Sequence, residues 1–338
     1  MFFGLTDQAR ELRDGVRDAL ATACPPAVVR AGWAGADPAA ADALWRTLGD
    51  LGLLGVLVPE AHGGLGLDDL VAVAVLEEAG WAGVPGPLVE TVVAAAPLLA
   101  AAGRLPAGSL EGSTRLTATT RDLTPYALLS DWVVQLGDGA ARLLPGERDG
   151  AAAPTVDGSR HASLVTRSGE LLAVEPGEVR LAELRATLGT AAFLLGLARR
   201  QLDLTVGYVK DRHQFGVPVG SFQAVKHPLA DAVVGTEFAW PAVLRAAHSL
   251  ATHDPDAAVH VSMAKALASD AAWQVSRVCL QAHGAMAYTT EYDLQLFAKR
   301  TWALAKDWGT ASQHRARIVA HLDINLDLNL DIPERTAR

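Results

Sequence analysis

Residues 208–218 read YVKDRHQFGVP, and residues 222–227 read FQAVKH. The first stretch lies where a long helical pattern gives way to a turn marked by glycine and proline. An arginine at such a helix end can direct its forked guanidinium at a phosphate oxygen, and Arg212 has this position. Gln214 and Phe215 add an amide and a flat apolar ring beside it. Arg212 is equally well explained as an ordinary cation favoured by the helix dipole, so these residues alone leave both interpretations open.

Helical patterns extend through the C-terminal half of the chain. They predict four helical segments, from about Leu184 to Val209, from Phe222 to Thr252, from Asp254 to Gly284 and from Thr290 to Leu322. The first segment has apolar residues spaced by four and three, which is typical of a buried seam. Long helices joined by short turns pack antiparallel, so residues 181–338 are predicted to form a four-helix bundle.

The N-terminal part, residues 1–112, is also predicted to be a helical domain. Its first helix carries on one face Leu5, Ala9, Leu12, Val16 and Ala19. Asp37-Pro38 is a helix start signal, because a proline in the first turn needs no N–H group. Asp68 or Asp69 is predicted to cap a later helix, which Gly80 is expected to end.

The middle of the chain, residues 113–180, changes to a β pattern. Short β-prone runs occur at residues 132–134, 162–166 and 171–174, separated by glycine, proline and aspartate. The sequence therefore predicts a mainly α protein with three parts. These are an N-terminal helical domain, a small and shortened β domain, and a C-terminal four-helix bundle.

Composition excludes several classes of partner. The chain has 38 acidic against 29 basic residues and a formal net charge of −9, so we expect no nucleic-acid partner. Cys24 and Cys279 lie far apart without a CxxC motif, so we expect neither a disulfide framework nor a metal site. The longest apolar run, residues 91–103, is about 13 residues long, whereas a membrane span needs roughly 20. With no targeting segment visible, we expect a cytoplasmic protein without a membrane span.

A second stretch, residues 281–288, reads QAHGAMAY. Small residues after a helix let a ligand approach the backbone, although an ordinary C-cap at Gly284 explains them equally well. Together, the two stretches resemble the acyl-CoA dehydrogenase family of flavoproteins. The family motifs R-x-Q/T-F-G and Q-x-x-G-G-x-G are matched by Arg212, Gln214, Phe215 and Gly216, and by Gln281 and Gly284. The sequences LGLLGVLVPE at residues 51–60 and GGLG at residues 63–66 are similar to the family's second helix and following loop.

This resemblance implies a shared flavin. In the family, these motifs of one subunit hold the ADP half of an FAD that is bound mostly by the neighbouring subunit. The implied cofactor-binding residues are Arg212 at the pyrophosphate, Gln214 and Phe215 along its cradle, and Gln281 and Gly284 at the adenosine. Ala285 and Ala287 replace later glycines of the second motif, and their methyl groups are expected to crowd the cofactor.

The other half of the family's site is missing from the sequence. The family surrounds the flavin ring with a T-E-P-x-A-G-S-D loop and a W-x-T-N strand, but residues 116–122 read LTATTRD. Its Y-E-G-T motif, which carries the base that removes the α-proton, is matched by DWGT at residues 307–310. Trp308 therefore occupies the position of the base, and Ala186 falls at the alternative position that some relatives use.

Asp307 and Glu183 are candidate substitutes for the missing base. A neighbouring residue on a helix points about 100° away, so Asp307 would need local rearrangement to act. A solvated acid at a helix start is the favoured interpretation of Asp307. No catalytic residue is assigned to the chain.

These features favour one chain of a hetero-oligomer. Certain bacterial acyl-CoA dehydrogenases that act on steroid side chains are similar, with two unlike chains in an α2β2 tetramer. We expect the chain to be the non-catalytic partner, sharing FAD with a second acyl-CoA dehydrogenase-type chain that dehydrogenates a bulky acyl-CoA. The alternative is a flavin-free homodimer that catalyses a dehydration or cyclisation in a biosynthetic pathway, with Asp307 as acid or base. A scaffold subunit that binds only its partner is a third possibility.

Overall fold

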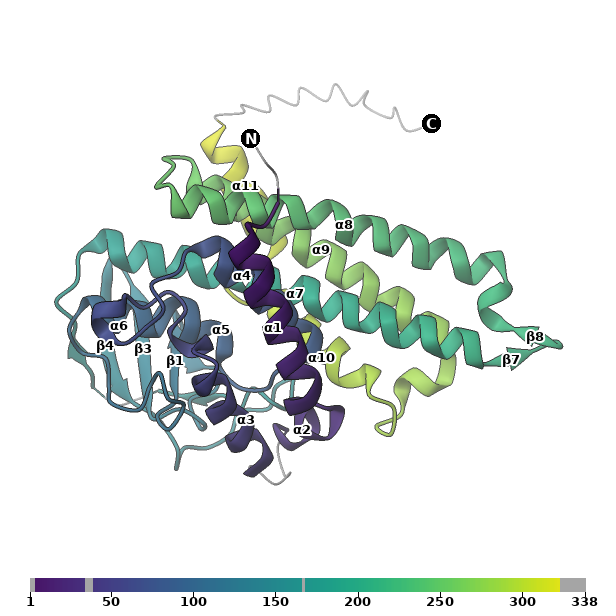
Figure 1. Cartoon of the computed structure of the whole chain (residues 1–338), viewed down its shortest axis with the longest axis horizontal. Helices are drawn as coiled ribbons and strands as arrows, with labels where there is room; N and C mark the ends of the chain where they lie inside the picture. Colours follow the sequence, from purple (N-terminus) through teal and green to yellow (C-terminus); the bar gives the residue numbers. More distant parts are fainter. Residues whose placement is uncertain (1–3, 34–38, 166–167, 323–338) are drawn as a thin grey trace, which may run out of the picture.

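Along the chain, helices precede and follow a small sheet, in the order that the sequence predicts (Figure 1). The structure is a computed structural model and describes residues 4–33, 39–165 and 168–322. The N-terminal helices are α1 (Asp7–Ala23), α2 (Pro26–Ala31), α3 (Ala39–Asp50), α4 (Asp69–Ala82), α5 (Leu88–Glu90) and α6 (Ala96–Ala101), with a π-helical turn at Thr91–Ala95. The mainly α fold class is confirmed. The start signal Asp37-Pro38 lies outside the described residues.

Helix α4 begins as predicted but ends later. Asp68 caps it by accepting a hydrogen bond from a backbone N–H group of the first turn at 3.0 Å. Gly80 does not end the helix. The helix runs to Ala82, and Gly83, which has a left-handed backbone conformation, caps it. A Cβ atom on Gly80 would lie 2.2 Å from the carbonyl oxygen of Phe193 on α7 (Pro176–Asp211). The prediction is wrong because the missing side chain of this glycine lets two helices pack closely, and does not end the helix.

The β domain holds a four-stranded sheet in the order β1-β3-β4-β6. Its strands are β1 (Leu116–Thr119), β3 (Trp132–Gly137), β4 (Ala140–Pro145) and β6 (Glu170–Leu171), and β2 (Leu123–Thr124) pairs separately with β5 (Ser163–Leu164). Strand β1 is parallel to β3, and the other pairs are antiparallel. The predicted strands in the described part of 162–166 and in 171–174 are shorter than expected. The reason is that few of their residues pair with a neighbouring strand.

Three of the predicted bundle helices are present as α7, α8 (Gln223–Ala251) and α9 (Ala257–His283), but α7 begins at Pro176 rather than at about Leu184. The fourth segment is divided into α10 (Leu294–Leu304) and α11 (Ala311–His321) rather than continuous. Trp308 and Gly309 break it with φ angles of 52° and 103°. Thr310 then starts α11 through a reciprocal capping box with Gln313.

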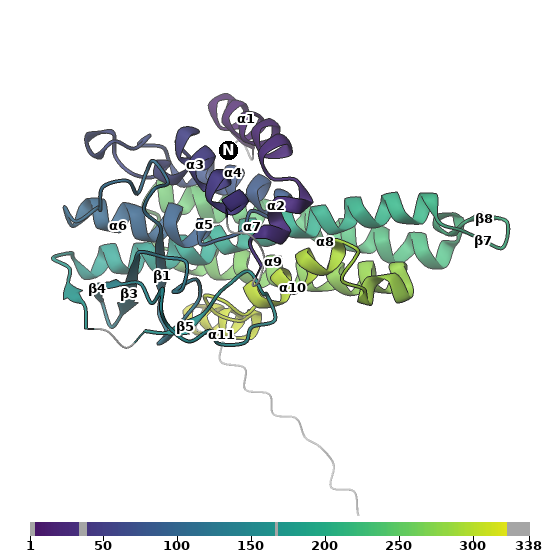
Figure 2. The ribbon, with the colours of Figure 1, turned by 90° about the horizontal axis from the view of Figure 1, so that it is seen from below.

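A two-stranded hairpin joins α7 to α8. Its strands are β7 (His213–Gln214) and β8 (Val217–Pro218). Figures 1 and 2 both show this hairpin at the far tip of the bundle, at the opposite end of the molecule from the sheet. The first of the two functional stretches therefore lies well away from the β domain.

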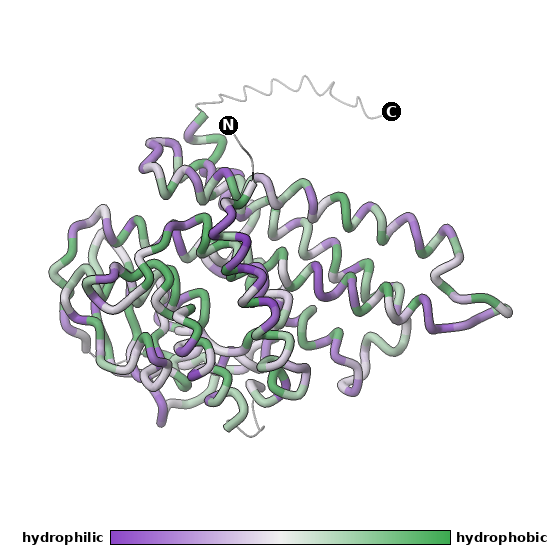
Figure 3. Tube along the Cα trace, in the orientation of Figure 1, coloured by the Kyte–Doolittle hydropathy of each residue, from purple (hydrophilic) through white to green (hydrophobic). Residues whose placement is uncertain are grey.

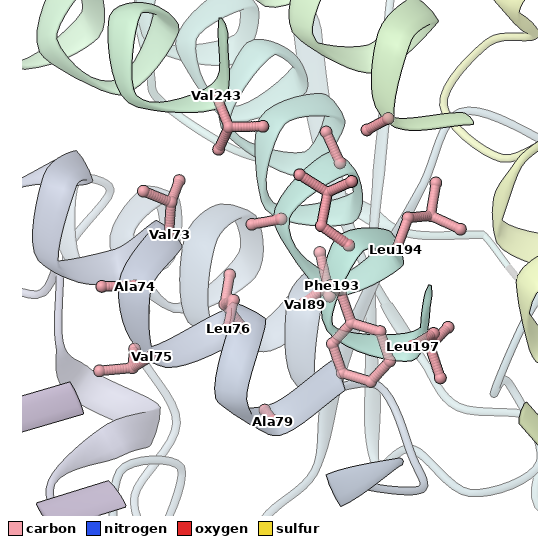
Figure 4. Packing of buried hydrophobic residues seen from close by; sticks show 14 of the residues in the cluster. Val73, Ala74, Val75, Leu76, Ala79, Val89, Phe193, Leu194, Leu197 and Val243 are labelled. Atoms are coloured by element: carbon pink, nitrogen blue, oxygen red, sulfur yellow. The ribbon is translucent and has the colours of Figure 1, made fainter. Parts of the chain in front are cut away.

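Helix α7 lies at the centre of the apolar core. Figure 4 shows it packed with α4 and α8 through side chains that include Leu76, Phe193 and Val243. A Cβ atom on Gly196 of α7 would lie 1.9 Å from the carbonyl oxygen of Glu77 on α4, so the two backbones are in close contact. By length and composition α7 could cross a membrane, but 78% of its most apolar window is buried in the protein. Such burial is typical of a core helix.

Candidate functional site

The tip of the bundle positions Arg212 at the end of α7. Its backbone N–H group donates to the carbonyl of Tyr208 at 2.9 Å, and its own carbonyl accepts from the N–H group of Val219 at 2.8 Å. Phe215 and Gly216, with φ angles of 54° and 80°, form the hairpin turn between these points. The end of α7 and strand β7 are hydrophilic in Figure 3. Local hydrogen bonding thus fixes the backbone that carries Arg212.

A groove of about 1070 Å³ beside the hairpin brings four of the five predicted residues together. Arg212 and Gln214 line it from the hairpin side, and Gln281 and Gly284 line it from the end of α9. Arg212 is exposed, and its guanidinium has no acidic partner among the described residues. An exposed, unpaired guanidinium in a groove is able to bind a phosphate group.

Phe215 lies apart from these four residues. Its side chain is 92% exposed at the tip of the hairpin and does not line the groove. The ring meets Phe222 edge-on, with 6.3 Å between the ring centroids. Within this chain, Phe215 is free to contact another molecule.

The end of α9 leaves room for a ligand at the backbone. Gly284 ends the helix with φ 59° and ψ −135°, and no atom lies within 4 Å of the place where its Cβ would be. Ala285 lines the groove, whereas Ala287 is buried in the apolar core. Only one of the two replaced glycines therefore adds a methyl group to the wall of the groove.

Among the lining residues of the groove that were not predicted are Tyr208 and Arg277. Each lies four residues before a predicted site residue on the same helix, so helical spacing was the available signal. The Tyr208 ring stacks on His283 at a centroid distance of 4.3 Å. Burial lowers the pKa of His283, which favours a neutral imidazole in this wall.

The expected position of the base lies in the loop between α10 and α11. Trp308 fills that position, and Asp307 beside it is buried rather than solvated as predicted. Asp307 forms ion pairs with Arg160 and, at 3.3 Å, with Arg121. Burial alone would raise the pKa of Asp307, but the charges of Arg160, Arg121 and Lys265 hold this pKa below its ordinary value. The carboxylate is therefore engaged as a structural partner and is a weak base.

Lys265 of α9 holds the same loop through hydrogen bonds. Its buried ammonium group donates to the carbonyls of Leu304, Ala305 and Gly309 at 3.1–3.3 Å, and to the hydroxyl of Ser269 at 3.0 Å. Burial lowers the pKa of Lys265 to about 7. A charged residue within the apolar run of α9 was a signal that the sequence prediction did not use.

A buried polar cluster joins the three parts of the chain next to Asp307. Arg300 of α10 donates to the Tyr126 hydroxyl at 3.1 Å and to the carbonyl of Gly86 at 3.2 Å. Glu90 of α5 is buried nearby, and burial raises its pKa to about 7, while Arg160 opposes the shift. These residues come from distant positions in the sequence, and no local motif marks them.

The comparisons with known proteins define the family. The model of the acyl-CoA dehydrogenase N-terminal domain matches residues 6–104, and that of the C-terminal domain matches residues 180–322. The chain belongs to the acyl-CoA dehydrogenase family.

Curated relatives cover almost the whole chain. The acyl-CoA dehydrogenase IpdE2 of Mycolicibacterium smegmatis is 32% identical, over 94% of this chain and 100% of that protein. IpdE2 of Mycobacterium tuberculosis is 35% identical, over 89% of this chain and 92% of that protein.

Solved structures of the same fold include assemblies of two chains. A variant of the Tcur3481-Tcur3483 steroid ACAD superimposes with a TM-score of 0.82 at 25% identity, over 94% of this chain and 98% of that chain. The ChsE4-ChsE5 complex from Mycobacterium tuberculosis gives a TM-score of 0.78 at 24% identity, over 96% and 99%, which shows the shared fold.

Members of this family generally bind FAD, and the residues of this chain fit one half of that cofactor. The unpaired Arg212, the amide of Gln281 and the open backbone at Gly284 suit the ADP half. The position where the sequence analysis expects the base holds the Trp308 indole, beside a carboxylate already held in ion pairs. The residues of the groove therefore suit the ADP half of FAD.

Proposed function

We propose that the chain is the non-catalytic subunit of a heteromeric acyl-CoA dehydrogenase. It contributes Arg212, Gln214, Phe215, Gln281 and Gly284 to the ADP half of an FAD that it shares with a partner chain. The observation that carries this proposal is the unpaired Arg212 in the groove, together with the indole at the base position. When bound, FAD accepts the hydride that leaves an acyl-CoA during α,β-dehydrogenation.

The residues of this chain bind and orient the cofactor. Arg212 offers a charged, two-pronged donor to the pyrophosphate, and Gln281 offers an amide to the adenosine. Phe215 projects from the hairpin, where its exposed ring is available to a neighbouring subunit. The exposed hairpin and the open groove suit a cofactor that lies between two chains.

The proton chemistry is assigned to the partner chain. The Trp308 indole donates a hydrogen bond and accepts no proton at neutral pH. Asp307 is occupied by Arg160 and Arg121, which removes the support for a flavin-free reaction that uses Asp307 as acid or base. Ala186 is buried and has no ionisable group.

The partner in this proposal is a second acyl-CoA dehydrogenase-type chain. The Tcur3481-Tcur3483 protein is a steroid ACAD whose name joins two designations. This likeness supports an unlike partner and a bulky, steroid-type acyl-CoA, and we propose an α2β2 assembly of the two chains. A homodimer of this chain would contain two sites, and neither site would have a base.

Removing the Arg212 guanidinium tests the proposal. The complex of this chain with its partner is purified with Arg212→Ala, and FAD binding is titrated by flavin fluorescence. Loss of a charge-assisted hydrogen bond is expected to weaken FAD binding by about tenfold or more. Lys210→Ala is the matched control, because Lys210 lies half a turn away on the same helix and does not line the groove.

Equal FAD affinity in both variant complexes would remove Arg212 from the site. Equal weakening would point to the general charge of the tip instead. Either result would contradict the proposed role.

A further inference from the structure

The groove at the tip continues along α9 beyond the residues assigned to the ADP half of the flavin. Its α9 wall carries Trp273, Arg277 and Gln281, which are spaced by four residues, so their side chains form a row on one face of the helix. Each step of this row rises about 6 Å, and the row ends near Gly284. An aromatic ring, a guanidinium and an amide therefore follow one another along a single wall.

Arg277 is a second unpaired cation in this groove. Its side chain is exposed, and no carboxylate pairs with it among the described residues. Within the same part of the chain, Asp270 is the one acidic residue of the groove wall, and it pairs with Arg315. Together with Arg212, the wall presents two positive charges without a counter-ion, in a chain whose formal net charge is −9. Such a wall attracts a ligand that carries more than one negative charge.

The two arginines lie on either side of the contact between α7 and α9. Tyr208 stacks on His283 with 4.3 Å between the ring centroids, which brings the ends of the two helices together. Arg212 follows Tyr208 by one turn towards the tip, whereas Arg277 precedes His283 by less than two turns. Along the helix axes, the Cα atoms of the two arginines are therefore about 15 Å apart. Two extended arginine side chains can meet one pyrophosphate group between them.

Trp273 offers a flat surface at the far end of the row. Its side chain is 40% exposed, and its ring lies against Trp302 with 6.2 Å between the centroids. The part of the groove wall that comes from α8 is apolar and includes Val225 and Pro228. An exposed aromatic ring beside an apolar wall is suited to a nucleobase, because every base has a π face that stacks on such a ring.

We propose that Trp273 and Arg277 bind the adenine ring and the pyrophosphate of the nucleotide in this groove. The adenine stacks on the Trp273 indole, the pyrophosphate lies between Arg277 and Arg212, and the ribose between them faces the amide of Gln281. This inference rests on the proposed function, because it takes the groove as the site of the ADP half of FAD. It adds the direction of the nucleotide, whose base points along α9 away from the tip.

Binding of ADP and of adenosine to the purified full-length chain tests this arrangement. Ligand-observed NMR gives both dissociation constants, and the parent chain is expected to bind ADP with a Kd of about 1 mM or tighter, and adenosine more weakly. Arg277→Ala is expected to weaken ADP binding about tenfold and to leave adenosine unchanged, because it removes a contact to phosphate. Trp273→Ala is expected to weaken both ligands about tenfold, because both stack through adenine.

Two further variants are the matched controls. Trp273→Phe keeps a stacking ring and is expected to retain most of the affinity for both ligands. Lys226 is an exposed cation at the start of α8 that lines a separate cavity, so Lys226→Ala is expected to change neither ligand. The proposal is overturned if the parent chain does not bind ADP saturably, or if Arg277→Ala weakens ADP binding no more than Lys226→Ala does. It is also overturned if Arg277→Ala weakens ADP and adenosine equally.

The Arg212→Ala variant separates this inference from the proposed function. If Arg212→Ala weakens ADP binding but the Arg277 and Trp273 variants do not, the groove still holds the nucleotide and only the direction along α9 is wrong. If none of the three variants weakens ADP binding, the groove is not the nucleotide site and both proposals fail.

Discussion

At the scale of the residue, Glu90 shows how a buried carboxyl group couples the fold to pH. Burial raises its pKa from 4.5 to about 7, and the Asp307 charge adds to this shift while Arg160 opposes it. Between these pH values the folded protein keeps a proton that the unfolded chain releases. The contribution of Glu90 to stability is therefore present below pH 4.5 and is lost as the pH rises towards 7.

Glu90→Gln removes this titration and keeps a neutral polar group. The variant is expected to gain stability relative to the parent protein as the pH rises from about 4.5 to 7, by up to about 3 kcal/mol. Chemical denaturation of both proteins at a series of pH values measures this difference. Glu170→Gln is the control, because Glu170 lies in an exposed pair with Arg104. A difference that stays constant with pH would show that Glu90 is ionised throughout.

At the scale of the element, the crossing of α4 and α7 depends on glycine. Gly196→Ala would put a Cβ atom 1.9 Å from the Glu77 carbonyl oxygen, so the helices must separate. The variant is expected to lose about 3 kcal/mol or more of its unfolding free energy, a cost similar to other overpacked cores.

Gly207→Ala, on the same helix, has the opposite expectation. Gly207 is exposed, and its added methyl group meets no atom within 4 Å. Alanine is the better helix former there, so we expect a gain of about 0.5–1 kcal/mol. Thermal unfolding of the two variants side by side checks both expectations, and a similar effect of both would argue against a specific crossing.

At the scale of the whole molecule, the proposed division of the site predicts the behaviour of the isolated chain. Expressed alone, it is expected to purify without bound flavin, because it holds only the ADP half of the cofactor. Co-expression with its partner chain is expected to restore the visible flavin absorbance. The ratio of flavin to protein absorbance measures both states. Near-stoichiometric FAD in the chain alone would show a complete ring site and contradict the division.

Sequence patterns predicted those helices whose ends are set by residues nearby in the sequence. The ends of α7, α8 and α9 follow from apolar spacing, from Asp254-Pro255 and from the turn at Gly216. The predicted residues of the tip groove were found in the same way, because they lie within two short stretches of sequence. Gly80 was misread because its role depends on Phe193, which is distant in sequence. Asp307 was misread because its partner Arg160 lies 147 residues away, and no periodicity reports such a pair.

The interlocked glycines of α4 and α7 also bear on how the proposed site is divided between the parts of the chain. Helices from before and after the sheet form one body, so the sheet is an insertion that leaves the body after α6 and rejoins it at α7. The insertion is also tied to its host, because Arg160 and Arg121 of its loops pair with Asp307 and Tyr126 contacts Arg300. The loops that would surround a flavin ring belong to the insertion, and the groove at the tip belongs to the host. Changes confined to the insertion would therefore alter the surroundings of a flavin ring and leave the walls of the groove unchanged.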